Sequence, residues 1–227
     1  MFHSSKIPIL WQMRIVLVSG YRRTGKDTFY QILQGECKSH FTWHAYAKPS
    51  ASVKDLRSPG MKFQQKSFAQ ELKLETAKEY GIPEFVSDDD KDVKQYLDTE
   101  TNDIVSARDL YIKHGALRRS QDRNYWCRRV LDAITEANIQ DQSLSYTVTD
   151  WRFPNEYAYT VSRFSDAVTV RLWNSDVPEP PADVESEHAL DAHATDLLLI
   201  PHYKPHEFQR ALEKFPQYAD YEHVGEY

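Results

Sequence analysis

Residues 14–28 read Arg14-Ile-Val-Leu-Val-Ser-Gly20-Tyr-Arg-Arg-Thr-Gly25-Lys26-Asp27-Thr28. The apolar run before Gly20 predicts a buried strand, and Phe29, Ile32 and Leu33 beyond Lys26 have the spacing of an amphipathic helix. A strand, a loop framed by two glycines, a lysine and a helix make up the G-x-x-x-x-G-K phosphate-binding loop. Asp27 stands where Ser or Thr usually follows the lysine.

Each part of this loop has a physical purpose. Gly20 and Gly25 allow backbone conformations that a side chain would forbid, so that backbone N–H groups turn toward phosphate oxygens. The helix that starts near Lys26 adds its positive dipole end, and the Lys26 ammonium reaches the terminal phosphates. We therefore predict a site for a nucleoside triphosphate.

The composition limits the class of protein. A chain of 227 residues is long enough for one α/β domain with insertions. Its net charge of −6 gives no general attraction for nucleic acid polymers or anionic membranes, and no apolar run has the length of a membrane span. Cys37 and Cys127 lie far apart, which argues against a disulfide framework. We expect a cytoplasmic protein with small-molecule partners.

The rest of the chain alternates strand and helix patterns. We expect strands over 41–46, 145–150, 167–171 and 196–200, and helices over 68–80, 106–112, 125–134 and 206–215. This alternation predicts an α/β fold with a central parallel sheet covered by helices on both faces. Residues 48–60 are rich in Ser and Pro and predict an inserted loop, and residues 1–13 predict a loosely docked N-terminal extension to a single domain over 14–227.

Asp150 closes one of these strands. In a parallel sheet, ligands gather at the carboxyl ends of the strands, where Gly20 also lies. A carboxylate near a phosphate loop can hold Mg²⁺ or accept a proton from the nucleophile. Arg152, two residues after Asp150, could donate two hydrogen bonds to one phosphate. An ordinary turn with an Asp–Arg surface pair remains the alternative.

A third group of candidates is a run of basic residues. Five arginines fall within residues 118–129, which is more than a chain of this net charge needs for solubility. One arginine guanidinium can bind two phosphate oxygens at once, and it keeps its positive charge, as phosphoryl transfer requires. We expect Arg118 and Arg119 in a turn after Gly115, Arg128 and Arg129 in ion pairs on a helix, and Trp126 in the core.

Together these segments resemble the phage-type deoxynucleoside monophosphate kinases, in the family's order and over roughly residues 14–200. The matching pieces are 19–28, 68–73 (Phe-Ala-Gln-Glu-Leu-Lys), 122–126 (Asp-Arg-Asn-Tyr-Trp), 149–156 (Thr-Asp-Trp-Arg-Phe-Pro-Asn-Glu) and 185–187 (Glu-Ser-Glu). Animal-type phosphomevalonate kinases are a more distant likeness, with the Gly-Lys-Asp loop and an Arg-Arg turn but without Phe-Pro-Asn-Glu.

The resemblance implies a P-loop kinase-like three-layer sandwich that transfers the γ-phosphoryl of ATP to the 5′-phosphate of a deoxynucleoside monophosphate. Mg²⁺ would be approached by Asp27 or Thr28 and organised by Asp150. The substrate would be bound by Lys73, Arg118, Arg119 and Arg152, of which Arg119 and Arg152 would clamp phosphates. Lys26, Arg119, Asp150 and Arg152 would form the catalytic group. The ATP phosphates would be held by the loop and the first helical turn: Gly20, Tyr21, Arg22, Arg23, Thr24, Gly25, Lys26, Asp27 and Thr28.

Some features depart from the family or stay open. The stretch 48–60 looks like an extra insertion, and Pro201-His202 stands where relatives tend to carry Asn-Asp. Glu185 and Glu187 match a late acidic patch, for which a surface role is equally compatible. A non-catalytic ATP-binding module is the alternative from another class, although arginines outside the loop favour transfer. Base, sugar and the choice between monomer and homodimer are left open.

Overall fold

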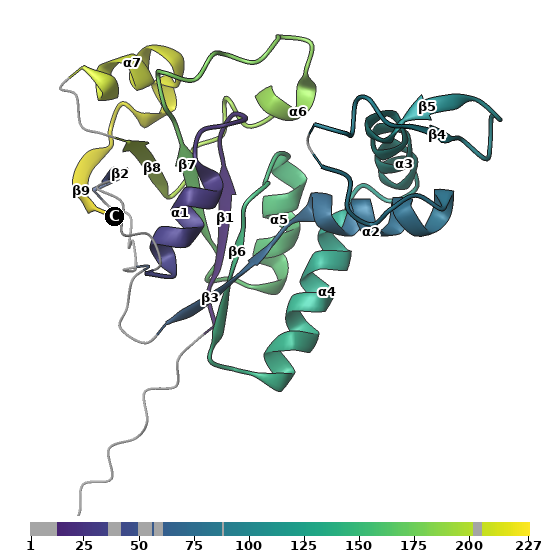
Figure 1. The fold of residues 1–227 in the computed structure, drawn as a ribbon. Helices are drawn as coiled ribbons and strands as arrows, with labels where there is room; N and C mark the ends of the chain where they lie inside the picture. Colours follow the sequence, from purple (N-terminus) through teal and green to yellow (C-terminus); the bar gives the residue numbers. More distant parts are fainter. Residues whose placement is uncertain (1–12, 36–41, 50–55, 57–60, 88, 202–205) are drawn as a thin grey trace, which may run out of the picture.

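The computed structural model describes residues 13–35, 42–49, 56, 61–87, 89–201 and 206–227 (Figure 1). Its main sheet has the strand order β3-β6-β1-β7-β8-β2-β9. These strands are β1 (Ile15–Ser19), β2 (Trp43–Ala47), β3 (Lys62–Lys66), β6 (Leu144–Val148), β7 (Val168–Leu172), β8 (Leu197–Pro201) and β9 (Glu222–Glu226). The expectations for residues 1–12, for most of 48–60 and for His202 lie outside the described residues.

The sheet is mostly parallel, which confirms the α/β class and corrects one detail. The neighbours β3, β6, β1, β7 and β8 all pair in parallel. The strand expected over 41–46 is present as β2, but it runs antiparallel to both β8 and β9. The predicted central parallel sheet is therefore found in five neighbouring strands and not at this edge, because an apolar pattern specifies the buried face of a strand and not its direction.

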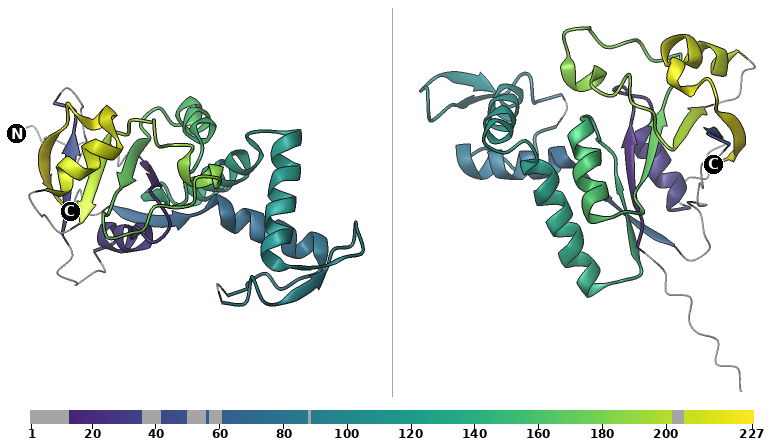
Figure 2. Two further views of the ribbon diagram at one scale, coloured as in Figure 1. Left: turned by 90° about the horizontal axis from the view of Figure 1, so that it is seen from above. Right: turned by 180° about the vertical axis from the view of Figure 1, so that it is seen from behind.

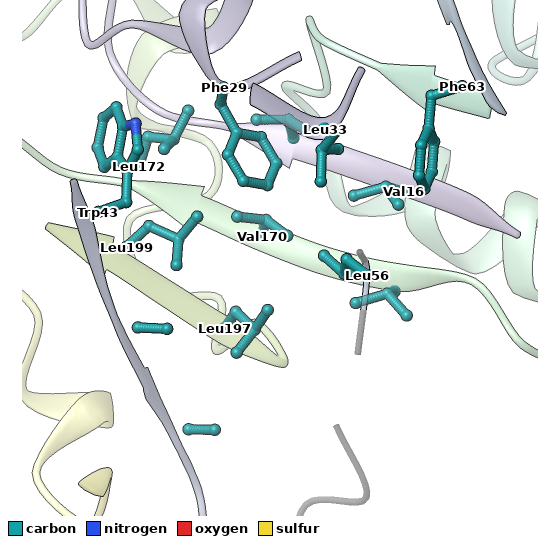
Figure 3. Packing of buried hydrophobic residues seen from close by; sticks show 14 residues of the cluster. Val16, Phe29, Leu33, Trp43, Leu56, Phe63, Val170, Leu172, Leu197 and Leu199 are labelled. Atoms are coloured by element: carbon teal, nitrogen blue, oxygen red, sulfur yellow. The ribbon is translucent and has the colours of Figure 1, made fainter. Parts of the chain in front are cut away.

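Helices lie on both faces of the sheet. The alternating side chains of β1 show this, since Val16 packs in one cluster with Phe29 of α1 (Lys26–Leu33), and Leu17 packs in another with Val130 of α4 (Tyr125–Gln140). Figure 3 shows Phe29 and Leu33 of α1 over Val16 and Val170. Burying one such side chain contributes about 1.5–3 kcal/mol. The face that α4 covers also carries α5 (Pro154–Arg163) and α7 (Glu207–Lys214).

A lobe of two helices and a hairpin extends beyond the edge of the sheet (Figures 1 and 2). It consists of α2 (Phe68–Tyr80), β4 (Gln95–Leu97), β5 (Ile104–Ser106) and α3 (Ala107–Gln121). The lobe has an apolar cluster of its own, in which Ala77 and Tyr80 of α2 meet Leu110 and Tyr111 of α3. The remaining short elements are α6 (Glu185–His188) and the 3₁₀ turn η1 (Pro216–Tyr218). No helix in the described ranges is long and apolar enough to cross a membrane.

The helix α3 continues past the place where the sequence predicted a basic turn. Arg118 and Arg119 lie within α3, so their placement in a turn after Gly115 was wrong. A Cβ atom on Gly115 would lie 3.3 Å from Arg119 Nη1 and 3.4 Å from Leu72 Cδ2 of α2. The glycine therefore permits a close approach of two helices here, instead of ending one.

Candidate functional site

The loop between β1 and α1 has a backbone that needs glycine at both ends. Gly20 has a φ of +141° and Gly25 a φ of +92°. A Cβ atom on Gly20 would lie 2.5 Å from the Leu172 carbonyl oxygen at the end of β7, so a side chain there would push two strands apart. Inside the loop, Thr24 Oγ1 donates to the Tyr21 carbonyl oxygen at 2.8 Å and holds the turn closed.

The start of α1 has the character of an anion site. Its N-cap is Gly25, and no side chain caps the first turn. The backbone N–H groups at this end and the positive end of the helix dipole therefore point toward the loop, where a phosphate would be stabilised.

Lys26 bends back over this loop. Its Nζ donates to the carbonyl oxygens of Gly20 at 2.9 Å and of Tyr21 at 2.8 Å. Burial, helped by the positive charge of Arg152, lowers the pKa of Lys26 from 10.5 to about 8. An anion bound beside Lys26 would favour the charged ammonium and raise this pKa, so Lys26 is suited to hold phosphate oxygens at neutral pH.

A buried ion cluster supports the loop from behind. Tyr21 Oη donates to Asp191 Oδ2 at 2.8 Å, and Arg171 Nη2 donates to Asp191 Oδ1 at 2.6 Å. Arg171 is only 2% exposed and lies over the Phe215 ring, while His188 Nδ1 lies 2.8 Å from Asp191 Oδ2. The cluster fixes Tyr21 to the segment that carries α6, a connection that no sequence pattern indicated.

Asp150 lies beside the loop, as predicted, and also anchors a helix. It follows β6, which pairs in parallel with β1, and the next residue, Trp151, donates its backbone N–H to the Val18 carbonyl oxygen at 3.2 Å. The Asp150 carboxylate accepts hydrogen bonds from the backbone N–H groups of Phe68 at 2.9 Å and Ala69 at 2.7 Å, and from Ser67 Oγ at 2.8 Å. It therefore joins the start of α2 to the sheet edge.

The turn after Asp150 is held by a buried carboxyl group. Glu156 Oε2 accepts hydrogen bonds from the backbone N–H groups of Arg152 at 2.8 Å and Phe153 at 3.0 Å. Burial raises the pKa of Glu156 to about 8, although these two hydrogen bonds oppose the shift. Glu156 thus fixes the backbone from which Arg152 projects.

Arg152 and the phosphate loop share one carboxylate. Arg152 Nη1 donates to Glu187 Oε1, and the backbone N–H of Arg22 donates to Glu187 Oε2 at 2.9 Å. Since Glu187 belongs to α6, this short helix lies over the sheet edge beside the loop (Figure 1). Glu185 of the same helix is exposed.

A cavity of about 490 Å³ opens next to Asp150 and Arg152, and we call it the Arg119 hollow. Lys73 of α2 and Arg119 of α3 line it, and the Arg119 guanidinium lies 5.8 Å from the centre of the Phe153 ring. The hollow brings together Lys73, Arg119, Asp150 and Arg152 from the predicted set. Two further carboxyl groups line it, those of Glu156 and of Glu185 from the acidic patch. It also contains residues that the sequence did not single out for a site: Phe68, Lys91, Arg108, Tyr111, Ile112, Phe153 and Ser186.

Arg118 does not reach this hollow. Its Nε donates to Glu75 Oε1 at 2.6 Å, and Tyr125 Oη donates to Glu75 Oε2 at 2.7 Å. These residues line a second cavity of about 670 Å³ on the other side of α2, which we call the Glu75 hollow. Arg129 lies there too and pairs with Glu71 at 3.4 Å, as expected for a structural arginine.

The predicted metal ligands, Asp27, Thr28 and Asp150, offer carboxylate and hydroxyl oxygen atoms. Asp27 is exposed at the start of α1, and its Oδ1 accepts a hydrogen bond from Gln65 Nε2 at 2.7 Å. Within the described ranges, no group of three or more His, Cys, Asp or Glu side chains is placed to hold a metal by itself. Carboxylate and hydroxyl oxygens suit Mg²⁺, which commonly takes one or two protein ligands together with water and substrate phosphates.

No protein-family model matches the chain, and no curated protein matches it.

Proposed function

We propose that this chain is a phosphotransferase that moves the γ-phosphoryl of ATP to the 5′-phosphate of a deoxynucleoside monophosphate, giving ADP and the deoxynucleoside diphosphate. One observation carries the proposal: the glycine-framed loop with Lys26 and the cation-lined Arg119 hollow meet at one sheet edge, with Arg152 between them. On this proposal the fold is of the P-loop kinase type.

The triphosphate is assigned to the loop. Backbone N–H groups from Gly20 to Thr28 and the Lys26 ammonium are the donors, and the start of α1 adds its dipole. Asp27 and Thr28 are the residues that would hold Mg²⁺, with Asp150 on the same edge. When bound, the ion would neutralise charge on the β- and γ-phosphates.

The acceptor is assigned to the Arg119 hollow. Its volume of about 490 Å³ lies in the range of small-molecule sites. Arg119, Arg152 and Lys73 supply positive charge for an acceptor phosphate, and Phe68 and Tyr111 supply apolar surface for a flat base. Asp150 contributes by holding α2, and with it Lys73, against the sheet edge.

The chemistry demands positioning more than covalent help. The second pKa of a monophosphate is about 6, so the acceptor is already a nucleophile at neutral pH and no strong base is needed. The main obstacle is repulsion between two phosphates, which costs about 4 kcal/mol per pair of unit charges at 4 Å and an effective dielectric constant near 20. Lys26, Arg119 and Arg152 offset this repulsion.

An acceptor panel tests the proposal. Coupled ADP release is measured with Mg·ATP and each deoxynucleoside monophosphate, with ribonucleotides and with phosphomevalonate. We expect stimulation by at least one deoxynucleotide. Stimulation by phosphomevalonate alone would transfer the assignment to the other kinase family. Binding of ATP with no stimulation by any acceptor would indicate a non-catalytic module.

A further inference from the structure

Glu187 lies in a place where a phosphate group would be expected. Its side chain is only 10% exposed, and its two oxygens accept from different parts of the candidate site. One donor is the backbone N–H of Arg22 in the phosphate loop, at 2.9 Å, and the other is the guanidinium of Arg152. A loop amide and an arginine are the donors that proteins use for phosphate oxygens.

The charges around Glu187 fit an anion site. Burial opposes ionisation, but the hydrogen bond and charge of Arg152 hold the pKa of Glu187 below its usual value, helped by the Arg22 N–H and Lys26. The negative charge of Glu187 in turn raises the pKa of Lys26, against the lowering by burial and Arg152. One carboxylate therefore balances the same positive groups that the proposed function assigns to nucleotide phosphates.

We propose that the Glu187 carboxylate fills a phosphate subsite in the unliganded protein, and that a nucleotide phosphate displaces it from Arg152 and the Arg22 N–H. This inference rests on the proposed function for the identity of the phosphate. Before binding, the Glu187 carboxylate keeps Arg152 beside the loop and reduces its repulsion with Lys26. On binding, the phosphate takes over both donors and Glu187 leaves the subsite.

The surrounding structure allows this exchange without releasing the segment. α6 is a single turn without a side-chain cap. The residues just after it stay attached through Asp191, which accepts hydrogen bonds from Tyr21 Oη at 2.8 Å and Arg171 Nη2 at 2.6 Å. Glu187 can therefore turn away while Asp191 keeps α6 near the loop.

The consequence is competition between Glu187 and the ligand. The carboxylate must be displaced before the subsite can take a phosphate, so its removal should strengthen anion binding. A residue that only positioned Arg152 would have the opposite effect, because its loss would leave Arg152 disordered and weaken binding.

The experiment is calorimetric titration of inorganic tripolyphosphate and of ATP into the whole chain and its variants. Glu187→Gln removes the charge at the subsite, and Asp183→Asn removes an equal charge from an exposed position four residues earlier, outside both hollows. We expect Glu187→Gln to lower Kd about tenfold, the effect of about 1.4 kcal/mol, and Asp183→Asn to change it by less than about twofold.

Glu187→Asp covers the case in which Glu187→Gln fails to fold, because the shorter carboxylate keeps its charge but cannot reach both donors, and it should also bind more tightly. Unchanged or weaker binding in the folded variants would overturn the inference, as would no binding by any of them. The proposed kinase function fails separately, if tripolyphosphate binds but no acceptor stimulates ADP release.

Discussion

Two neighbouring arginines on α3 face two different hollows. Arg118 enters the Glu75 hollow, where Glu75 accepts its hydrogen bond at 2.6 Å and also accepts from Tyr125 at 2.7 Å. Arg119 enters the Arg119 hollow, and within the described part of the chain no carboxylate lies at ion-pair distance from it or from Lys73. The Glu75 hollow is larger, about 670 Å³ against about 490 Å³.

The two hollows differ in how their charges are balanced, and this difference, rather than volume, favours the Arg119 hollow as the acceptor site of the proposed function. In the Glu75 hollow, the protein's own carboxylates neutralise Arg118 and Arg129, and the pairs hold α2 to α3 and α4. In the Arg119 hollow, Arg119 and Lys73 have no carboxylate partner among the described residues. Two other cations of this hollow are paired, Arg108 with Asp92 and Arg152 with Glu187. Successive residues of a helix differ in direction by about 100°, so adjacent arginines can serve structure and binding separately.

The largest expected effect on activity comes from removing Lys26 in the loop beside the Arg119 hollow. Lys26→Ala should lower ADP release with the best acceptor about 10²- to 10³-fold, because it removes the ammonium that the proposed function assigns to the transferred phosphoryl. Thermal unfolding should change little, since the hydrogen bonds of Lys26 within the described residues go to two loop carbonyl oxygens. Turnover like that of the unsubstituted chain would separate the loop from catalysis.

The comparison is tested directly by a matched pair of variants. Arg119→Ala should lower kcat/KM for the acceptor about 10- to 100-fold with little change in Tm, because a charge-assisted contact to phosphate is lost. Arg118→Ala should leave kcat/KM within about threefold but cost about 1 kcal/mol, seen as a fall in Tm of about 2–4 °C, because Glu75 loses a partner. Equal kinetic losses in both would remove the distinction between the hollows.

Asp150 links the lobe that carries both hollows to the sheet edge. Asp150→Asn should lower the free energy of unfolding by about 1–2 kcal/mol, because its amide group cannot accept all three hydrogen bonds from Ser67, Phe68 and Ala69. Urea unfolding measures this loss, and Asp132→Asn, in a surface pair with Arg163, is the control with little change. Stability equal to the parent with lost activity would assign Asp150 to the chemistry alone.

A change of pH should distinguish the loop side from the Glu75 hollow. Lys26, with a pKa lowered to about 8, loses its proton as the pH rises through 8, and Glu156, with a pKa raised to about 8, becomes charged over the same range. Both changes make the net charge of the site less positive. The affinity for tripolyphosphate should therefore be highest below pH 8 and fall by up to about tenfold per pH unit above it.

The pH dependence also has internal controls. Lys26→Arg should remove the part due to Lys26, and Glu156→Gln the part due to Glu156, because neither replacement titrates in this range. Hydrogen bonds from Tyr125, His114 and Arg118 keep the pKa of Glu75 low despite burial, so the Glu75 hollow keeps its ion pairs above pH 8. An affinity that stays constant from pH 7 to pH 9.5 would contradict these assignments.

The sequence predicted what local residues determine. The strand, glycine loop and helix of residues 15–33 follow from their own pattern, and Asp150 lies near Gly20 because β6 and β1 are parallel neighbours. Most predicted elements agree with the structure to within a few residues; α3 and α4 extend further. The edge strand β3 was missed because only Phe63 among its residues is buried, which leaves almost no apolar pattern. α5 was also missed, although Pro154 at its first position is a helix-start signal.

What the sequence could not supply are contacts between distant segments. Gly115 was interpreted as the end of a helix because glycine is common in turns. The structure shows another reason for a glycine here, which is the close contact with Leu72 on a different helix. Arg118 and Arg119 were both expected in the turn after Gly115, and the resemblance alone placed Arg119 in the catalytic group. The hydrogen bond of Arg118 to Glu75, on another helix, could not be seen in the sequence. Glu187 was noted as part of an acidic patch, but its hydrogen bonds to the Arg22 N–H and to Arg152 depend on how α6 lies over the loop.

The most direct measurement is a crystal structure of the chain with Mg²⁺ and a pentaphosphate in which one phosphate chain joins adenosine to the deoxynucleoside that stimulates most in the acceptor panel. We expect the phosphates to run from the loop at Lys26 past Arg152, and the deoxynucleoside to lie in the Arg119 hollow. A ligand bound in the Glu75 hollow, or phosphates away from the Gly20–Thr28 loop, would contradict the account.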